Sequence, residues 1–276
     1  MRRADVLRYS LWTAVVGTAL RNRKEYGVPT AWLTHLTANT CTLFLPEVVS
    51  LLLQRPLSEW PPALQPLLRT LERRVRQDPN YVGYVAPLAL GFIASYPEYS
   101  IYHGRWAERN ILGFGADSLP HASAAYGLAR FSSEVLLTLH HELPDRHALV
   151  QPAAWAARHV DALGAAAVVV VTLIWELSEY LAHHAEVQAT GRDPREVNMQ
   201  WGWLDAITDS LSNLFGLVAA IAVRRSASTT GAASTMCSSP PAPNPPESER
   251  FEWPNEQERR PNDRQAIESK LEREVA

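Results

Sequence analysis

Residues 173–186, "LIWELSEYLAHHAE", decide how the rest of the chain is interpreted. The segment closes the most apolar run of the sequence, "LGAAAVVVVTLIW" (residues 163–175), and adds three glutamates and two histidines in quick succession. Such a run is either the buried helix of a soluble protein or a helix that lies in lipid. Which of the two applies depends on whether similar runs recur along the chain.

The average composition conceals two different regions. Over all 276 residues the chain is 46% hydrophobic and 20% charged, with a net charge of −3, which is typical of a soluble protein. After Arg225, however, Ser, Pro, Glu and Arg dominate, and such a segment cannot bury enough apolar surface to fold. We therefore expect a helical body over residues 1–225 and a disordered, Pro-, Ser- and charge-rich cytoplasmic tail over residues 226–276.

Apolar blocks recur throughout the body. They have about the length that a bilayer requires of a helix, roughly 20 residues, and they lack the alternation typical of strands. Prolines fall mostly between the blocks. We expect an all-α, polytopic membrane helical bundle with about six spans, over residues 7–20, 31–53, 81–96, 119–140, 160–183 and 204–223.

The distribution of arginine predicts the topology. Short cytoplasmic loops of membrane proteins carry an excess of Lys and Arg, and here more arginines fall on the side of the amino terminus, including the cluster at residues 69–76. This bias predicts that both termini are cytoplasmic, although "RNRK" (residues 21–24) runs against it. The first block also has the form of a signal peptide, so a retained span and a cleaved signal both stay open.

With this topology, polar side chains of several helices fall at the same, outer depth. Glu176, Glu179 and His183 lie within an arc of about 60°, at about 100° per residue. Ionisable groups that face lipid cost several kcal/mol, so we expect this stripe to face the bundle interior. The other groups expected at this depth are His35 and Asn39 on the second block, Asp117 and His121 on the fourth, and Asp205, Asp209 and Ser212 on the sixth.

Two regions of the chain resemble a known family. "GADSLPHASAAYGL" (residues 115–128) is similar to a WD-x-x-x-H helix start, and "WELSEY" (175–180) with "NMQWGWLDAITDSLSNLFGLVAA" (198–220) is similar to the WE-x-x-E and NMQ-x-G-x-x-D-x-x-x-D-x-x-x-N-x-x-G run of the YjdF-like bacterial inner-membrane proteins. That family is itself similar to VanZ-like proteins. The resemblance covers about residues 31–223. The longer, arginine-bearing loop before Asp117 and the Pro-rich tail depart from the pattern.

The resemblance implies a multi-pass protein of the bacterial cytoplasmic (inner) membrane and implies no biochemical activity. It also implies a set of recurrent polar positions. Carried over onto this sequence, these positions are Asp117, His121, Glu176, Glu179, Asn198, Gln200, Asp205, Asp209 and Asn213.

Chemistry leaves an enzymatic role open for these side chains. Carboxylates and imidazoles act as general acids and bases and bind Zn, Mn or non-haem Fe, and helical bundles hold such metals between facing helices. A divalent metal cofactor and a lipid-linked or envelope substrate would fit this reading, although the Glu-x-x-His pairing of di-metal bundles is absent. The candidate catalytic residues are Asp117, His121, Glu176, Glu179, Asp205 and Asp209, and the candidate metal ligands are His121, Glu176, Glu179, His183 and Asp209.

Two non-enzymatic roles also stay open. The stripe would serve a proton-coupled solute transporter, but the chain shows no inverted repeat of the kind that many carriers have. Alternatively it forms a structural or ligand-binding pocket. Asp205 then complements the helix dipole, Glu176 pairs with Arg105 or Arg109, and the structural polar residues are Asn198, Gln200 and Asn213.

The expected partners are membrane lipids. "LERRVRQ" (residues 71–77) is more typical of a basic interfacial helix than of a nucleic-acid site, so we expect no nucleic acid. Trp155, Trp201 and Trp203 are expected at the membrane interface. Cys41 and Cys237 are too few for a disulfide scaffold or a zinc cluster. The tail is a candidate for binding a cytoplasmic partner, and Ser123 with Gly127 offers a small-residue packing face that leaves the oligomeric state open.

Overall fold

The computed structural model describes residues 3–29, 32–102, 114–194, 197 and 201–236. Throughout this part of the chain the regular structure is helical, with no strand, which confirms the all-α fold class. The chain divides into two units, Met1–Thr230 and Gly231–Ala276, and the description below concerns the first. Residues 237–276, most of the expected tail, lie outside the described residues.

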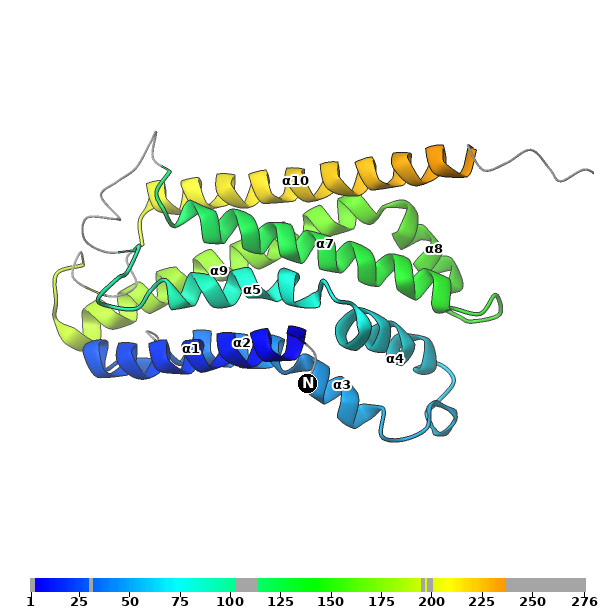
Figure 1. Cartoon of the computed structure of the whole chain (residues 1–276). Coiled ribbons are helices and arrows are strands. Elements are labelled where there is room, and N and C mark those ends of the chain that lie inside the picture. Colours follow the sequence, from blue (N-terminus) through cyan, green and yellow to red (C-terminus); the bar gives the residue numbers. More distant parts are fainter. Residues whose placement is uncertain (1–2, 30–31, 103–113, 195–196, 198–200, 237–276) are drawn as a thin grey trace, which may run out of the picture. The chain divides into compact units, whose positions relative to one another are not determined.

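Each expected block corresponds to one helix or to a pair of helices (Figure 1). Short helices connect them: η2 (Leu57–Glu59), α4 (Gln65–Leu71), the π-helix η3 (Glu72–Gln77) and α8 (Val150–Arg158). The longer helices are α1 (Arg3–Tyr26), α2 (Leu33–Leu43) followed by α3 (Leu45–Leu52), α5 (Tyr81–Ile93), α7 (Ser118–Glu142), α9 (Val160–Thr190) and α10 (Trp203–Met236).

The expected second span is not one helix. α2 ends before Phe44, and Pro46 lies in the first turn of α3. Proline has no N–H, so the carbonyl of Thr42 loses its helical donor and accepts instead from the Tyr81 hydroxyl at 2.6 Å. The carbonyl of Leu43 accepts from the buried guanidinium of Arg8. Side chains of α1 and α5 thus supply the donors that the break removes.

α9 and α10 form an antiparallel pair (Figure 1). Asp161 in the first turn of α9 accepts from Arg224 Nε at 2.9 Å and from Arg225 Nη2 at 2.9 Å, both in the carboxyl-terminal half of α10. In the amino-terminal half of each helix, Asn213 of α10 donates to Thr172 Oγ1 of α9 at 3.0 Å. α10 continues to Met236, so residues 226–236, expected in the tail, are helical.

α7 packs closely against its neighbours through small residues. Ala125 and Ala129 form a buried cluster with Val168 of α9 and with Leu217 and Ala220 of α10. A Cβ at Gly127 would overlap the backbone of Tyr84 in α5, and one at Gly216 would overlap the carbonyl of Ala122. Such close approach increases the packing contact between helix backbones. Gly127, which was expected on a packing face, therefore packs against α5 of the same chain.

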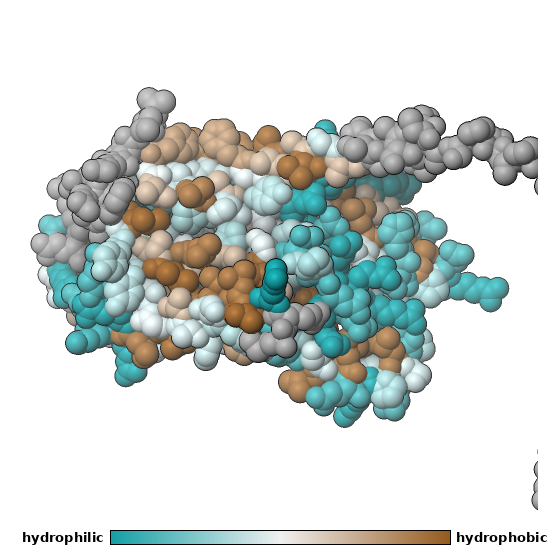
Figure 2. All heavy atoms as spheres, viewed as in Figure 1, coloured by the Kyte–Doolittle hydropathy of each residue, from teal (hydrophilic) through white to brown (hydrophobic). Residues whose placement is uncertain are grey.

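Two helices within the described residues are long and apolar enough to cross a membrane, Val160–Thr190 and Trp203–Ala227. Buried positions make up only 17% of the apolar stretch of the first and 39% of that of the second. Leu173, Ile174 and Phe215 are 64%, 63% and 63% exposed. Figure 2 shows apolar side chains along the exposed face of α10. α5 is much shorter, about 20 Å at 1.5 Å per residue.

The basic segment expected at the membrane interface spans the end of α4 and η3. Two of its arginines pair with carboxylates of α7: Arg73 with Glu142 at 2.8 Å and Arg74 with Glu134 at 2.9 Å. These contacts bind η3 to the carboxyl-terminal half of α7.

Candidate ligand site

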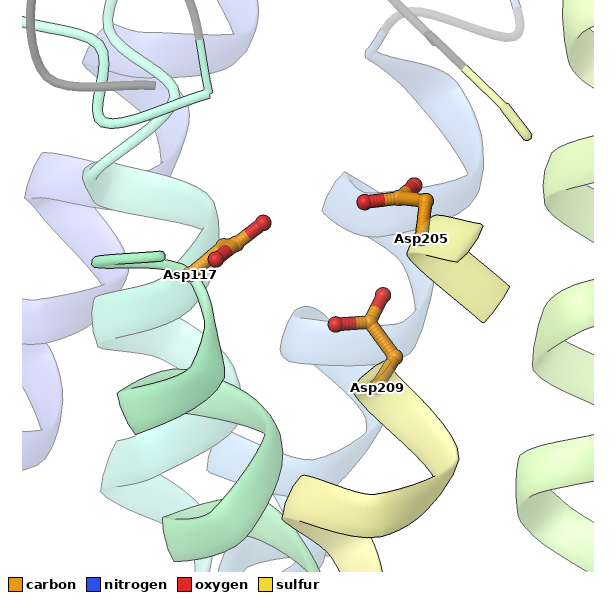
Figure 3. Close-up of side chains that lie close together, drawn as sticks. All are labelled: Asp117, Asp205 and Asp209. Atoms are coloured by element: carbon orange, nitrogen blue, oxygen red, sulfur yellow. The ribbon is translucent and has the colours of Figure 1, made fainter. Parts of the chain in front are cut away.

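Three aspartates meet where α7 and α10 begin. Asp117 caps α7 and accepts from the Ser118 N–H at 2.9 Å, while Asp205 lies in the first turn of α10 and Asp209 one turn further on. Carboxylate oxygens of the three residues lie within 4.8 Å of one another. Figure 3 shows their side chains converging from the two helices.

α9 brings two further carboxylates to the same place. Oxygens of Glu176 and Glu179 lie within 4.8 Å of each other and of an oxygen of Asp209. Asp209 therefore belongs to two groups of three carboxylates. The acidic cluster, as we call Asp117, Glu176, Glu179, Asp205 and Asp209, joins three helices.

Asp209 occupies the most enclosed position of the cluster. The residue is only 4% exposed, and its Oδ2 lies 3.2 Å from Nε2 of His121. Its Oδ1 is buried, and within the described residues no group donates a hydrogen bond to it. Both carboxylate oxygens of Glu176 are likewise buried and form no hydrogen bond of normal geometry among the described residues. Glu179 differs, because its Oε1 accepts from the indole N–H of Trp175 at 2.7 Å.

Within the part of the chain that the structure describes, no basic side chain balances this charge from the cavity wall. Among the described residues that line the cavity there is neither Lys nor Arg. Buried carboxylates at close range repel one another, and they are costly to keep ionised unless protons or a cation lie between them. The geometry therefore suits a ligand that is a cation or carries a positively charged group.

Four members of the cluster, Asp117, Glu179, Asp205 and Asp209, line one end of a cavity of about 860 Å³. Val85, Leu88 and Phe92 of α5 contribute to its apolar wall. Both Val168 and Glu179 line it, and they are about 16 Å apart along α9 at 1.5 Å per residue. An elongated, mostly apolar space with a few polar groups at one end is typical of a small-molecule site.

Aromatic side chains form the wall beside the acidic cluster. His35 stacks on Phe92 with 4.8 Å between ring centroids, and it meets the edge of Trp175 at 5.2 Å. Tyr102 donates its hydroxyl to the Gly91 carbonyl at 3.2 Å, and burial raises the pKa of its phenol, so it remains a donor. Trp201, expected at the membrane interface, lines the cavity instead.

The sequence did not place the three aromatic residues Trp175, Tyr102 and Trp201 in the site. Trp175 offers a signal, because it directly precedes Glu176 and lies one turn before Glu179, so its indole can reach that carboxylate. Tyr102 offers none, because it follows α5 in a connection whose path cannot be inferred from spacing.

His183 does not join the cluster as a candidate metal ligand. It is buried on the expected face of α9 but belongs to neither group of close carboxylates. It lies seven residues beyond Glu176, about 10 Å along the axis, so sharing a face does not bring the two side chains together.

The remaining polar candidates have other partners. Asn39 donates to the carbonyl of His35 at 2.9 Å, and Ser212 donates to that of Thr208 at 2.8 Å, each within its own helix. Asn213 links α10 to α9 through Thr172. Four residues named for structural contacts, Asn198, Gln200, Arg105 and Arg109, lie outside the described residues.

No family model matches this sequence, and neither a curated protein nor a solved structure is significantly similar to it. The site is therefore interpreted from its own geometry.

Proposed function

We propose that this chain is an integral membrane protein that binds an amphipathic ligand in the cavity between α5, α7, α9 and α10. The apolar part of the ligand lies along the cavity wall, and its polar or cationic part lies against the acidic cluster. One observation carries the proposal: a cavity of about 860 Å³ with apolar walls ends in Asp117, Glu179, Asp205 and Asp209, and no described Lys or Arg lines it.

The exposed apolar surface of α9 and α10 supports the membrane location. In a soluble protein the core helix buries its apolar residues, whereas only 17% and 39% of the positions in these two apolar stretches are buried. Exposed apolar surface on this scale typically marks contact with lipid or with another protein. In this proposal α1, α2 with α3, α5 and α7 cross beside them, giving six passes with both ends cytoplasmic and membrane lipids as partners.

The same reading makes the chain a YjdF-like protein of a bacterial cytoplasmic membrane. Its Asn213 and Gly216, which match the N-x-x-G of that pattern, contact α9 and α7 respectively. In this proposal the N-x-x-G part of the family pattern serves helix packing, whereas the acidic positions form the pocket.

A second candidate function is acid/base chemistry on a lipid-linked or envelope substrate. The observation that favours it is the pair formed by His121 Nε2 and Asp209 Oδ2, 3.2 Å apart beside the cavity. A carboxylate that orients an imidazole is a common arrangement for a general base.

Mass spectrometry of molecules that remain bound through detergent purification tests ligand binding. Ala124 lines the cavity, whereas Ala166 is exposed on α9. We expect Ala124→Phe to reduce the co-purified amphiphile at least tenfold, because the ring fills space that the ligand needs, and Ala166→Phe to leave it unchanged. Equal amounts bound to both variants, with equal melting temperatures, would contradict the proposal.

A further inference from the structure

Two groups of carboxylates share one residue at the end of the cavity. Asp117, Asp205 and Asp209 form the first group, and Glu176, Glu179 and Asp209 form the second. In each group the nearest oxygens lie within 4.8 Å of one another. Because Mg²⁺, Mn²⁺ and Ca²⁺ bind oxygen at about 2.0–2.6 Å, ligands on opposite sides of one ion are about 4–5 Å apart. Each group therefore has the spacing of a single coordination shell.

Unsatisfied acceptors point independently to a missing positive partner. The side chain of Asp209, the residue that the two groups share, is only 5% exposed. Its Oδ1 nevertheless has no hydrogen-bond donor among the described residues. Both carboxylate oxygens of Glu176 are buried and form no hydrogen bond of normal geometry among the described residues, although the indole N–H of Trp201 lies beside them. A buried acceptor without a donor loses the hydrogen bonds that it would make to water, and such acceptors are rare in native proteins.

We propose that the acidic cluster binds a pair of divalent cations, with Asp209 as the bridging carboxylate. Asp117 and Asp205 complete the ligands of one ion, and Glu176 and Glu179 complete those of the other. Two ions that share a carboxylate lie about 3.5–4 Å apart. His121 holds the bridging carboxylate from the side through Oδ2 and so fixes its orientation.

The donor set determines the class of metal. The five carboxylates supply only oxygen, which suits Mg²⁺, Mn²⁺ and Ca²⁺ rather than Zn²⁺ or Cu²⁺, which prefer nitrogen and sulfur. With three carboxylates for each ion, coordination positions stay open toward the cavity. The cation pair does not require an amphipathic ligand, so it goes beyond the function proposed above.

Manganese titration of the purified full-length chain, followed by electron paramagnetic resonance, tests the proposal. We expect two Mn²⁺ per chain with a spin-coupled signal. Asp205→Asn and Glu176→Gln each remove one ligand from one ion, so each variant should bind one Mn²⁺ at least tenfold more tightly than the second and lose the coupling. Asp209→Asn removes the bridge and should weaken both. Asp145→Asn, in an exposed loop, is the control and should match the unmodified chain.

Several outcomes would overturn the cation pair. They are a folded chain that binds no Mn²⁺, two ions without coupling, or Asp209→Asn binding like the unmodified chain at an unchanged melting temperature. If Asp209→Asn does not fold, Asp205→Asn and Glu176→Gln decide the matter, because the pair requires each to lose a different ion. A chain that keeps its amphiphile but binds no cation overturns the pair alone, and a chain that binds two ions but no amphiphile overturns the ligand proposal alone.

Discussion

Spacing along single helices predicted most of the acidic cluster. Glu176 with Glu179, and Asp205 with Asp209, are one turn apart, so helical periodicity places each pair on one face. The same rule included His183, which lies one turn beyond Glu179 and belongs to neither group of close carboxylates. Helical periodicity gives the direction in which a side chain points. Contact also depends on the position of the residue along the helix axis relative to the neighbouring helix, and this position depends on where that helix begins.

One substitution, Glu176→Gln, distinguishes a structural role of Glu176 from a role in the site. Its carboxylate lies close to those of Glu179 and Asp209, so Glu176→Gln removes repulsion without changing the shape of the side chain. In the presence of a chelator we expect the variant to be more stable by about 1 kcal/mol, in the range seen when a functional site is relieved of strain. Thermal unfolding in detergent measures this.

Glu142→Gln is the matched control, since Glu142 at the end of α7 pairs with Arg73 of η3, whose side chain is 58% exposed. An ion pair with a solvent-exposed partner contributes about 0–1 kcal/mol, so the melting temperature of this variant should stay equal or fall slightly. A clear loss of stability in Glu176→Gln would instead assign that carboxylate a structural partner.

At the scale of the element, the sequence predicted where helices lie better than where they break. The apolar blocks at residues 160–183 and 204–223 lie within α9 and α10. The break between α2 and α3 was missed although Pro46 marks it, because a proline inside an apolar block ends or kinks the helix that precedes it. Its stabilising donors, on Arg8 and Tyr81, are distant in the sequence, so no local pattern announces them.

Gly216 tests the close packing of α10 on α7. Adding a Cβ there would overlap the backbone carbonyl of Ala122, which can yield only if the helices separate. We expect Gly216→Ala to destabilise the chain by about 1–3 kcal/mol, the usual cost of overpacking. Gly17→Ala in α1 is the control: its Cβ would meet nothing within 4 Å, and alanine favours helix, so stability should hold or rise. Equal melting temperatures for the two variants would contradict the packing.

At the scale of the whole molecule, hydropathy alone does not determine the number of passes. α9 and α10 meet the length and composition of a span, whereas α5 is too short to cross about 30 Å of hydrocarbon by itself. α7 is long enough but carries Arg130 and Glu134, which pair with each other at 3.2 Å. α7 packs against α5 and α9, so its sequence can carry charged residues that pair within the chain.

The direction of α9 decides on which side of the membrane the acidic cluster lies, and single cysteines can report it. The two natural cysteines are first replaced by serine, because Cys41 is exposed. Arg192→Cys then places a thiol just after α9, and Asp145→Cys places one between α7 and α8, near the opposite end of the bundle (Figure 1). Both positions are exposed.

The excess of arginine on the side of the amino terminus predicts that α9 runs outward. In intact cells an impermeant maleimide should therefore label Arg192→Cys, and it should label Asp145→Cys only after the membrane is opened. The reverse pattern would keep α9 as a span but place the acidic cluster toward the cytoplasm, where its ligand would have to come from inside the cell. Labelling of both thiols from one side would mean that α9 does not cross, and its exposed apolar face would then have to be covered by another protein.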